Sequence, residues 1–281
     1  MLTVLEVVKK TSEFFASKGI ESPRLNAELI VGHALGLPRM SLYIEFERPV
    51  GDAELGAVRE LVRRRGRREP VQHILGFTEF CGLRLKTDRR ALIPRPETEL
   101  LVETITARCA APPGSILDLG TGCGAIALAL AKAFPLARVT AVDASTEALL
   151  LAAENAEATG LAGRVTFVES DWFKGLPAGE RYDLIASNPP YLSADETAAA
   201  APEVREHEPG RALTAGDGGF SEIEKIVAGA LEALVPGGML ALEIGSGHRA
   251  RLADALGKAG YARTEPLADL AGRDRYCLAW R

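Results

Sequence analysis

The chain has 281 residues and a net charge of −5, with 47% hydrophobic and 25% charged residues. This balance is typical of a folded globular protein and excludes a globally disordered, collagen-like or coiled-coil chain. No apolar run reaches about 18 residues, so we expect no transmembrane helix, and the acids near the start do not fit a signal peptide. The four cysteines form no C-x-x-C pair, which argues against disulfides and a metal site and favours a cytoplasmic protein.

Charge is distributed unevenly along the chain. Residues 1–90 contain 16 Lys and Arg against 12 Asp and Glu, whereas the remaining residues contain 17 against 26. The basic excess is densest between Arg59 and Arg68. This segment fits either a solvated helix face or a docking patch for an acidic protein or RNA phosphate, and the sequence leaves both interpretations open.

The first 70 residues have a helical pattern. Apolar residues recur at roughly helical spacing from Leu2 to Phe15, Ser22-Pro23 is a typical helix start, and Asp52 is expected to cap a third helix. The pattern predicts a small α-helical bundle domain over residues 1–70, with a recognition or support role.

The period then changes. Residues 71–80 and 81–86 are expected to form two short strands joined by a turn at Cys81-Gly82. We therefore predict a β-hairpin linker over residues 71–90.

Residues 91–281 alternate between strand and helix patterns. Strands are expected at SILDLG, RVTAVD, VTFVES, YDLIASN, MLALEIG and RYCLAW. Helices are expected over residues 97–109, 125–134, 146–159, 221–234 and 248–259. Alternation at this spacing predicts an α/β domain with a doubly wound parallel sheet.

A glycine-rich segment stands where the first of these strands ends. It reads Asp118-Leu119-Gly120-Thr121-Gly122-Cys123-Gly124, and Asp143 ends the next strand. Glycines there allow a sharp turn and the close approach of a ligand, and a carboxylate at Asp143 can accept both ribose hydroxyls of a nucleoside. The pattern also fits the NAD fingerprint in its alanine form, and a tight turn that binds nothing.

Two details favour S-adenosylmethionine over NAD. Asp118 precedes the first glycine, where an acid suits a cationic amino-acid tail and disfavours a pyrophosphate. Gly124 completes a G-x-G-x-G pattern. The residues therefore favour S-adenosylmethionine as cofactor, with S-adenosylhomocysteine as the product.

The tetrapeptide Asn188-Pro189-Pro190-Tyr191 follows the fourth strand, at the sheet edge where open α/β folds bind ligands. Two prolines stiffen this loop and remove N–H donors, which leaves the Asn188 side-chain oxygen and the Pro189 carbonyl as acceptors. Two acceptors beside an aromatic ring suit a planar –NH₂ group, whose lone pair is thereby aimed at a methyl donor. We predict Asn188, Pro189 and Tyr191 as catalytic residues, and all four residues as substrate-binding.

These motifs resemble the class I S-adenosylmethionine-dependent methyltransferases that carry an N-P-P-Y motif. Within that group the chain resembles the protein-(glutamine-N5) methyltransferases of peptide chain release factors. The resemblance is carried by residues 69–76 (EPVQHILG) and 92–99 (LIPRPETE), together with Ala27-Glu28, Glu208-Pro209 and Ala212-Leu213. The chain departs from the pattern at His73, Asn26 and Asp217, away from the predicted chemistry.

The resemblance implies a seven-stranded Rossmann-like domain over residues 91–281 that methylates the glutamine in the Gly-Gly-Gln loop of a release factor. It implies that Asp143 holds the ribose, that Trp172 lies beside the adenine, and that residues 188–191 grip the glutamine. The implied cofactor contacts are Gly120, Thr121, Gly122, Cys123, Gly124, Asp143, Trp172 and Asn188.

Three other functions remain compatible with the sequence: methylation of a ribosomal-protein glutamine, N6-methylation of adenine in nucleic acid, and a non-catalytic scaffold that binds S-adenosylmethionine. The acidic catalytic domain weighs against nucleic acid, and the intact N-P-P-Y motif weighs against a scaffold. We expect a release factor as partner, with no membrane and no direct requirement for nucleic acid.

Overall fold

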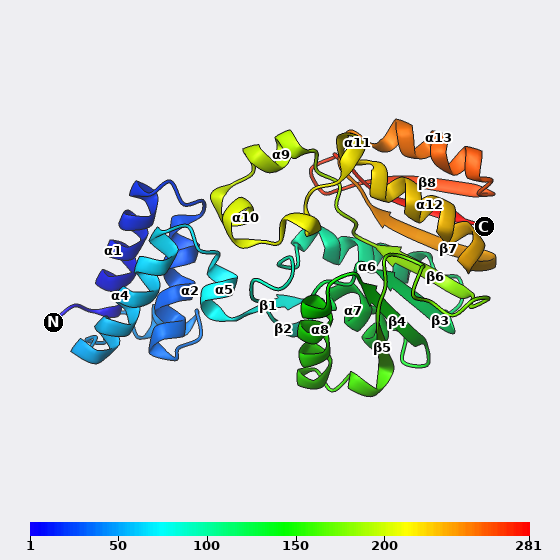
Figure 1. The fold of residues 1–281 in the computed structure, drawn as a ribbon. Helices are drawn as coiled ribbons and strands as arrows, with labels where there is room; N and C mark the ends of the chain where they lie inside the picture. The colour runs from blue at the N-terminus through cyan, green and yellow to red at the C-terminus, as the bar shows by residue number, and fades with distance from the viewer. The chain divides into compact units, whose positions relative to one another are not determined.

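The computed structural model describes residues 1–281, and the chain divides into two compact units. The first unit comprises Met1–Phe77 and Ala201–His207. The second comprises Thr78–Ala200 and Glu208–Arg281. Figure 1 shows the first unit mainly as blue and cyan helices, and the second as a sheet covered by helices.

Helices form most of the first unit. They are α1 Val4–Ser17, α2 Pro23–Leu35, α3 Ser41–Ile44, α4 Asp52–Gly66, α5 Val71–Leu75 and α10 Pro202–His207. Thr3 begins α1 through a capping box with Glu6, and Pro23 stands in the first turn of α2 as predicted. Gly51, rather than the expected Asp52, caps α4, because Glu54 bonds back to the Gly51 N–H.

Residues 71–75 form helix α5, so the prediction of a strand there was wrong. The Ile74 N–H donates to the Pro70 carbonyl and closes the first turn. Gly76, at φ 80°, ends the helix in the left-handed conformation that glycine adopts without strain. A proline before the segment and a glycine after it therefore outweigh its strand-like composition.

The hairpin is correspondingly shorter than predicted. Its strands are β1 Phe77–Phe80 and β2 Leu83–Lys86. The turn lies at Cys81-Gly82, as expected, and both residues have a positive φ, which is what a two-residue type I′ turn requires.

The arginine-rich end of α4 is largely engaged within the first unit. Arg65 is buried; its Nε lies 2.8 Å from Oδ1 of Asn26, and its Nη2 lies 2.8 Å from a carboxylate oxygen of Glu203 on α10. Arg68 bonds the other oxygen of Glu203 at 2.8 Å. These two arginines therefore hold α10 in the first unit.

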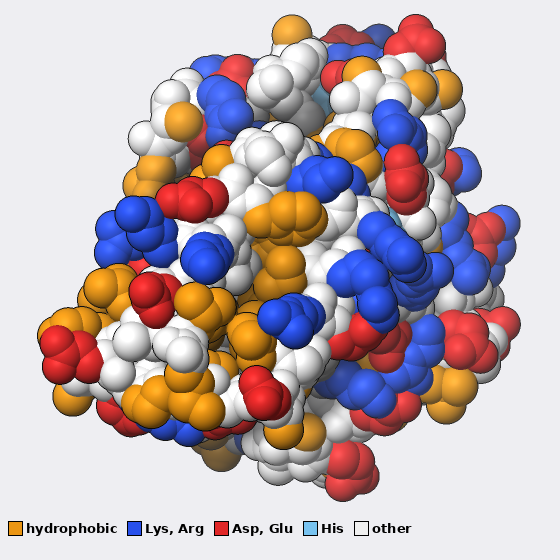
Figure 2. Space-filling view, turned by 90° about the vertical axis from the view of Figure 1, so that its left-hand side faces the viewer, with side chains coloured by type: hydrophobic (Ala, Val, Ile, Leu, Met, Phe, Trp, Pro, Cys, Tyr) orange, Lys and Arg blue, Asp and Glu red, His pale blue; other side chains and the backbone are white.

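Other arginines of this segment are paired locally. Arg63 pairs with Glu60, and Arg64 pairs with Glu69. Figure 2, which looks onto the face at the left of Figure 1, shows blue and red side chains side by side. Arg59 and Arg67 carry no such ion pair, so the free positive charge is smaller than the sequence suggests.

A seven-stranded sheet forms the centre of the second unit, in the order β5-β4-β3-β6-β7-β9-β8. Its strands are β3 Ser115–Leu119, β4 Arg138–Asp143, β5 Val165–Glu169, β6 Tyr182–Ser187, β7 Leu234–Glu243, β8 Arg263–Ala268 and β9 Asp274–Trp280. The first five are parallel, and β9 is antiparallel to both β7 and β8. The predicted fold class is confirmed.

Helices cover both faces of this sheet (Figure 1). They are α6 Pro96–Arg108, α7 Ala125–Ala133, α8 Thr146–Ala158, α12 Ser221–Ala233 and α13 Arg249–Ala259, with the short α9 Ala194–Ala199 and α11 Gly216–Gly219 in the loops. Helices α6, α7 and α8 pack on one face, with Ile116 and Ala141 among the strand residues below them. Helices α12 and α13 pack on the other, with Leu117 and Val142. Burial on both faces explains the continuous apolar runs of the central strands.

Strand β8 is the one strand of the sheet that the sequence pattern did not predict. It lies at the edge, pairs only with β9, and has no buried residue, so it lacks an apolar run. Strand β7 also begins earlier than expected, at Leu234. No helix in the chain combines the length and the apolar character needed to cross a bilayer.

Candidate active site

A cavity of about 320 Å³ lies in the second unit at the carboxyl ends of the parallel strands. Strand order reverses between β3 and β6, and loops at such a switch point form a crevice. The lining residues from these loops are Gly120 and Gly122 after β3, Asp143, Ala144 and Ser145 at and after β4, Ser170, Asp171 and Trp172 after β5, and Asn188 and Pro190 after β6.

The glycine-rich segment makes the sharp turn that the sequence predicts. Gly120, Gly122 and Gly124 all have a positive φ, of 71°, 57° and 87°. The N–H groups of Gly120 and Thr121 both donate to the Val142 carbonyl at 2.9 Å. A Cβ on Gly120 would lie 3.3 Å from the Trp172 ring, so a side chain there would crowd the tryptophan as well as strain the backbone.

Both carboxylate oxygens of Asp143 accept from backbone N–H groups beside the cavity. Its Oδ2 accepts from the Gly122 N–H at 2.9 Å, and its Oδ1 accepts from the Ser145 N–H at 2.8 Å. The carboxylate thereby joins the turn after β3 to the turn after β4. Each oxygen retains a further lone pair, so the group can still accept from a ligand in the cavity.

Trp172 has an unusual backbone conformation for a large residue, with φ 54°. The hydroxyl of Ser170 donates to the Trp172 carbonyl at 2.7 Å, and the indole Nε1 donates to Glu222 at 2.7 Å. Strained residues persist where surrounding bonds fix them, and they concentrate at functional sites. The Trp172 ring thus packs against Gly120 and gives the cavity a flat side before any ligand binds.

Asp118 lies beneath the cavity rather than in its lining. It is fully buried, and its Oδ2 accepts from the Thr121 hydroxyl at 2.6 Å and from the Ala127 N–H at 3.1 Å, in the first turn of α7. Its Oδ1 has no partner. Burial raises the pKa of Asp118 to about 7, against the opposing effect of these two bonds. In the structure Asp118 therefore joins the glycine-rich turn to the first turn of α7.

Asn188 stands at the rim with its side chain held from behind. Its Nδ2 donates to the Thr98 hydroxyl at 3.1 Å, and that hydroxyl donates to Oε2 of Glu243 at 2.7 Å. Tyr191 does not line the cavity, and its hydroxyl donates to Oε1 of Glu243 at 3.2 Å. The Asn188 oxygen bonds no protein group, which leaves it available as an acceptor.

The predicted site residues separate into two groups. Gly120, Gly122, Asp143, Trp172, Asn188 and Pro190 line the cavity, whereas Thr121, Cys123, Gly124, Pro189 and Tyr191 are not among its lining residues. The Cys123 thiol is packed in the core, and burial raises its pKa to about 12. Its carbonyl accepts from the Asn155 side chain at 2.9 Å. Cys123 therefore contributes its side chain to the core and its backbone carbonyl to the support of the turn.

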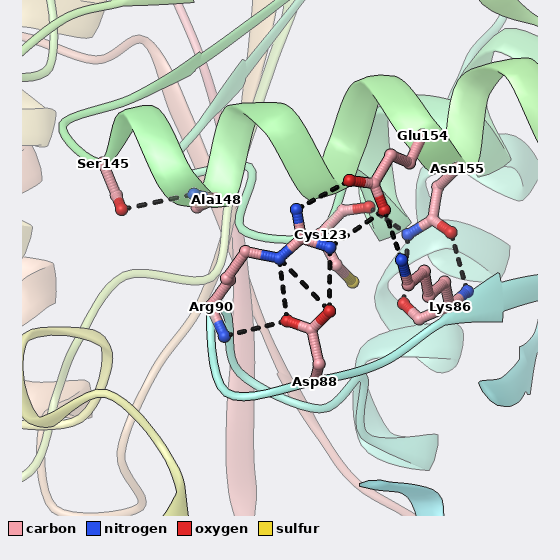
Figure 3. Close-up of polar contacts among 8 residues, drawn as sticks. All are labelled: Lys86, Asp88, Arg90, Cys123, Ser145, Ala148, Glu154 and Asn155. Carbon is pink, nitrogen blue, oxygen red and sulfur yellow. Dashed lines mark hydrogen bonds and ion pairs between the residues drawn. The ribbon is translucent and has the colours of Figure 1, made fainter. Parts of the chain in front are cut away.

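Residues 90–92 line one side of the cavity, and the sequence did not predict this. Arg90 bonds both Asp88 and Glu154 (Figure 3). The Asn155 side chain bonds both backbone groups of Lys86: its Oδ1 lies 2.6 Å from the Lys86 nitrogen, and its Nδ2 lies 3.2 Å from the Lys86 carbonyl oxygen. These contacts hold residues 90–92 against α8. Arg90 stands just before the stretch 92–99, but outside it, and the resemblance assigned it no role.

Residues 209–216 supply another wall, in part from Pro209, Arg211 and Ala212. Glu208, whose side chain is almost fully buried, accepts from the Ile93 N–H at 3.2 Å and pairs with Arg95. The stretches 92–99 and 208–213 that carry the sequence resemblance therefore meet beside the cavity.

This set of groups fits a nucleoside with a tail attached to its ribose. The carboxylate has spare lone pairs for a sugar, and the indole has a flat face for a base. The glycine turn lets a linked tail approach closely. No cluster of His, Cys, Asp and Glu suited to a metal ion is present.

Comparison with known proteins gives two family matches. Residues 6–76 match the PrmC N-terminal domain, and residues 96–217 match the Methyltransferase small domain. The chain is 45% identical to a release factor glutamine methyltransferase of Deinococcus radiodurans, over 94% of this chain and 93% of the relative. It is 41% identical to one of Rhodopirellula baltica, over 97% and 94%.

Among solved structures, a T. thermophilus 16S rRNA N2 G1207 methyltransferase in complex with AdoMet and guanosine superposes with a TM-score of 0.53. The match covers 73% of this chain and 49% of that one at 20% identity. At that identity the likeness concerns the fold alone.

Proposed function

This chain belongs to the release factor glutamine methyltransferases, and from that premise we propose that it transfers a methyl group from S-adenosylmethionine to the side-chain amide nitrogen, N5, of a glutamine in a peptide chain release factor. The observation that carries the proposal is Asn188, which stands at the rim of a nucleoside-sized cavity with its amide nitrogen already bonded and its oxygen free. The glutamine of the Gly-Gly-Gln loop, which the sequence resemblance implies, is the proposed acceptor.

The cavity residues support S-adenosylmethionine as the ligand. Asp143 would accept from the ribose hydroxyls, and Trp172 would lie along the adenine. The turn at Gly120 and Gly122 leaves room for the methionine part. When bound, this cofactor supplies a methyl group activated by a sulfonium sulfur.

The residues of the N-P-P-Y loop address the weak nucleophilicity of an amide. Its nitrogen lone pair is delocalised into the carbonyl, so the group must be held with that lone pair in line with the methyl carbon. The Asn188 oxygen and the Pro189 carbonyl would each accept one N–H, which orients the nitrogen and stabilises its developing positive charge. In the transfer the nitrogen lone pair would form the N–C bond while the electrons of the broken S–C bond stayed on sulfur, and one N–H proton would leave to solvent.

We also propose that the first unit recognises the body of the release factor. A flexible loop alone would present its glutamine to many enzymes, so selection requires a second contact. The first unit exposes large apolar side chains, with Met40 71% and Ile44 78% accessible, and the two arginines without ion pairs, Arg59 and Arg67. Reversing Arg59 and Arg67 to Glu is expected to raise KM for an intact release factor and to leave KM for a Gly-Gly-Gln peptide unchanged. Equal KM values for the intact factor would favour a solvated helix face.

The free cysteines and the release factor substrate support a cytoplasmic location. The acidic second unit supports a reaction that needs no direct contact with nucleic acid.

A transfer assay with labelled S-adenosylmethionine tests the proposed function. The substrates are an intact release factor, the same factor with Gln→Ala in its Gly-Gly-Gln loop, ribosomal protein, and DNA. We expect label on the intact factor only. Label on the Gln→Ala factor, or preferential labelling of ribosomal protein or DNA, would contradict the proposal.

A further inference from the structure

Three side chains far apart in the sequence form one hydrogen-bonded chain behind the N-P-P-Y loop. Asn188 follows β6, Thr98 lies in the first turn of α6, and Glu243 ends β7. The Asn188 Nδ2 to Thr98 Oγ1 distance is 3.1 Å, and the Thr98 Oγ1 to Glu243 Oε2 distance is 2.7 Å. Thr98 is 4% exposed and Glu243 is 1% exposed, so the bond between these two residues is shielded from solvent.

The Glu243 carboxylate determines which groups donate and which accept in this chain of hydrogen bonds. An ionised Glu243 only accepts, so the single hydroxyl proton of Thr98 is committed to it. The Thr98 oxygen is then left as an acceptor, and it requires a donor from Asn188. Of the two ends of the Asn188 amide only the –NH₂ end donates, and the oxygen must therefore face the opposite way.

We propose, on the basis of the proposed function, that Thr98 and Glu243 are positioning residues that lock the Asn188 side chain with its oxygen toward the substrate amide. An unconstrained asparagine turns its amide by half a rotation at little cost. It would then present N–H donors to a group that itself offers only N–H donors. Locking the amide removes that unproductive arrangement before the substrate binds.

Two further groups lie near Glu243. The Tyr191 hydroxyl donates to its Oε1 at 3.2 Å, and Nη1 of Arg275 lies 3.2 Å from that hydroxyl. Burial raises the pKa of Glu243, whereas Thr98, Arg275 and Tyr191 oppose this and the nearby Glu97 adds to it. Arg275 thus lies near the buried carboxylate and is linked to it through the Tyr191 hydroxyl, while its Nε lies 3.8 Å from Oδ2 of Asp269. This arrangement also gives Tyr191 a role that does not require it to line the cavity.

The test compares Thr98→Val with Thr98→Ser. Valine keeps the shape of threonine but removes the hydroxyl, and serine restores it. We expect kcat for an intact release factor to fall by about 10- to 100-fold in Thr98→Val, since misorienting one charge-stabilising group has an effect of this order. The affinity for S-adenosylmethionine by calorimetry is expected to stay within about threefold, and Thr98→Ser is expected to recover most of kcat. A kcat for Thr98→Val within threefold of wild type, or no recovery in Thr98→Ser, would overturn the proposal.

Glu243→Gln tests the other half of the chain without creating a cavity. Its amide can donate to Thr98, which frees the threonine proton to reach the Asn188 oxygen and reverses the chain. We expect a loss of kcat comparable to that of Thr98→Val, and no further loss in the double variant, because both substitutions remove one constraint. If the fold-losses of kcat in the two single variants multiply in the double variant, the two residues act separately, and the proposal is overturned.

A measurement without substrate separates this inference from the proposed function. In protein saturated with S-adenosylmethionine and labelled with ¹⁵N-asparagine, the Nδ2 proton of Asn188 that faces Thr98 is expected to exchange slowly with solvent. The slow exchange should be lost in Thr98→Val and regained in Thr98→Ser. Unchanged exchange in Thr98→Val would overturn the positioning role. An inactive wild-type enzyme with the expected exchange pattern would instead count against the release factor as substrate.

Discussion

The carboxylate of Asp143 accepts the backbone N–H of Gly122 at 2.9 Å, and so ties the end of β4 to the glycine turn after β3. The residue predicted to hold the ribose therefore also shapes the turn on which the cofactor would lie. Cofactor affinity should depend on Asp143 twice, through direct contacts and through the geometry of the turn.

Asp143→Ala is accordingly expected to weaken the binding of S-adenosylmethionine by at least about tenfold, since hydrogen bonds to a charged group contribute about 1.5–3 kcal/mol each. Isothermal titration calorimetry measures this. Glu147→Ala is the matched control, because Glu147 is an exposed acid in the first turn of α8 and does not line the cavity. Equal affinities for the two variants would show that Asp143 has been assigned wrongly.

Asn188→Ala should separate catalysis from cofactor binding. Removing the acceptor is expected to lower single-turnover transfer by about 100-fold or more, because the substrate nitrogen loses both its orientation and a group that stabilises its charge. The cofactor affinity should change only modestly, because most of the lining residues are untouched. Retention of more than about a tenth of the wild-type rate would contradict the role of Asn188 as a clamp.

Asp118 predicts a pH dependence of stability in the protein without cofactor. Burial raises its pKa from 3.8 to about 7, so protonated Asp118 is favoured in the folded state. Its contribution to the free energy of unfolding is therefore present in full below pH 3.8 and is lost as the pH rises through about 7. The loss amounts to a few kcal/mol, at about 1.4 kcal/mol for each pKa unit.

Asp118→Asn removes this titration and keeps the size of the side chain. Urea unfolding between pH 5 and 8 is expected to show a smaller fall in stability for the variant than for wild type. All other titrating groups are common to both proteins and cancel in the comparison. Parallel curves would show that Asp118 is ionised throughout this range.

Arg65 and Arg67 are close in sequence and should respond differently to truncation. Arg65→Ala leaves Glu203 and Asn26 without their buried partner, and is expected to lower the free energy of unfolding by roughly 3 kcal/mol. Arg67 is exposed and carries no ion pair, so Arg67→Ala is expected to stay within about 0.5 kcal/mol of wild type. Chemical denaturation of the full chain measures both. Similar values for the two would contradict the structural role of Arg65.

The central sheet was predictable because its parallel strands are buried on both faces and therefore read as apolar runs between helical patterns. Strand β8 was not, since an exposed edge strand stabilised by its pairing with β9 has no such run. Residues 71–75 were predicted wrongly, because the flanking Pro70 and Gly76 favour a short helix more strongly than the strand-like composition favours a strand.

The candidate site divides in the same way. Asn188 and Asp143 follow strands within recognisable motifs, so local sequence was sufficient to select them. Thr98 and Glu243 contact each other across 145 residues of chain, and their relation to Asn188 exists only once α6, β6 and β7 lie together. Thr98 lies in the stretch 92–99 that carries the resemblance, but its bond to Asn188 comes only from the tertiary structure, so the sequence did not predict this role.

The most direct test of the central claim is tandem mass spectrometry of a release factor after incubation with the protein and S-adenosylmethionine. The proposed function predicts a single added methyl group, located on the side-chain amide nitrogen of the glutamine in the Gly-Gly-Gln loop. The Asn188→Ala variant should leave that peptide unmodified. A methyl group on another residue, or an unmodified glutamine alongside a methylated ribosomal protein or nucleic acid, would contradict the account.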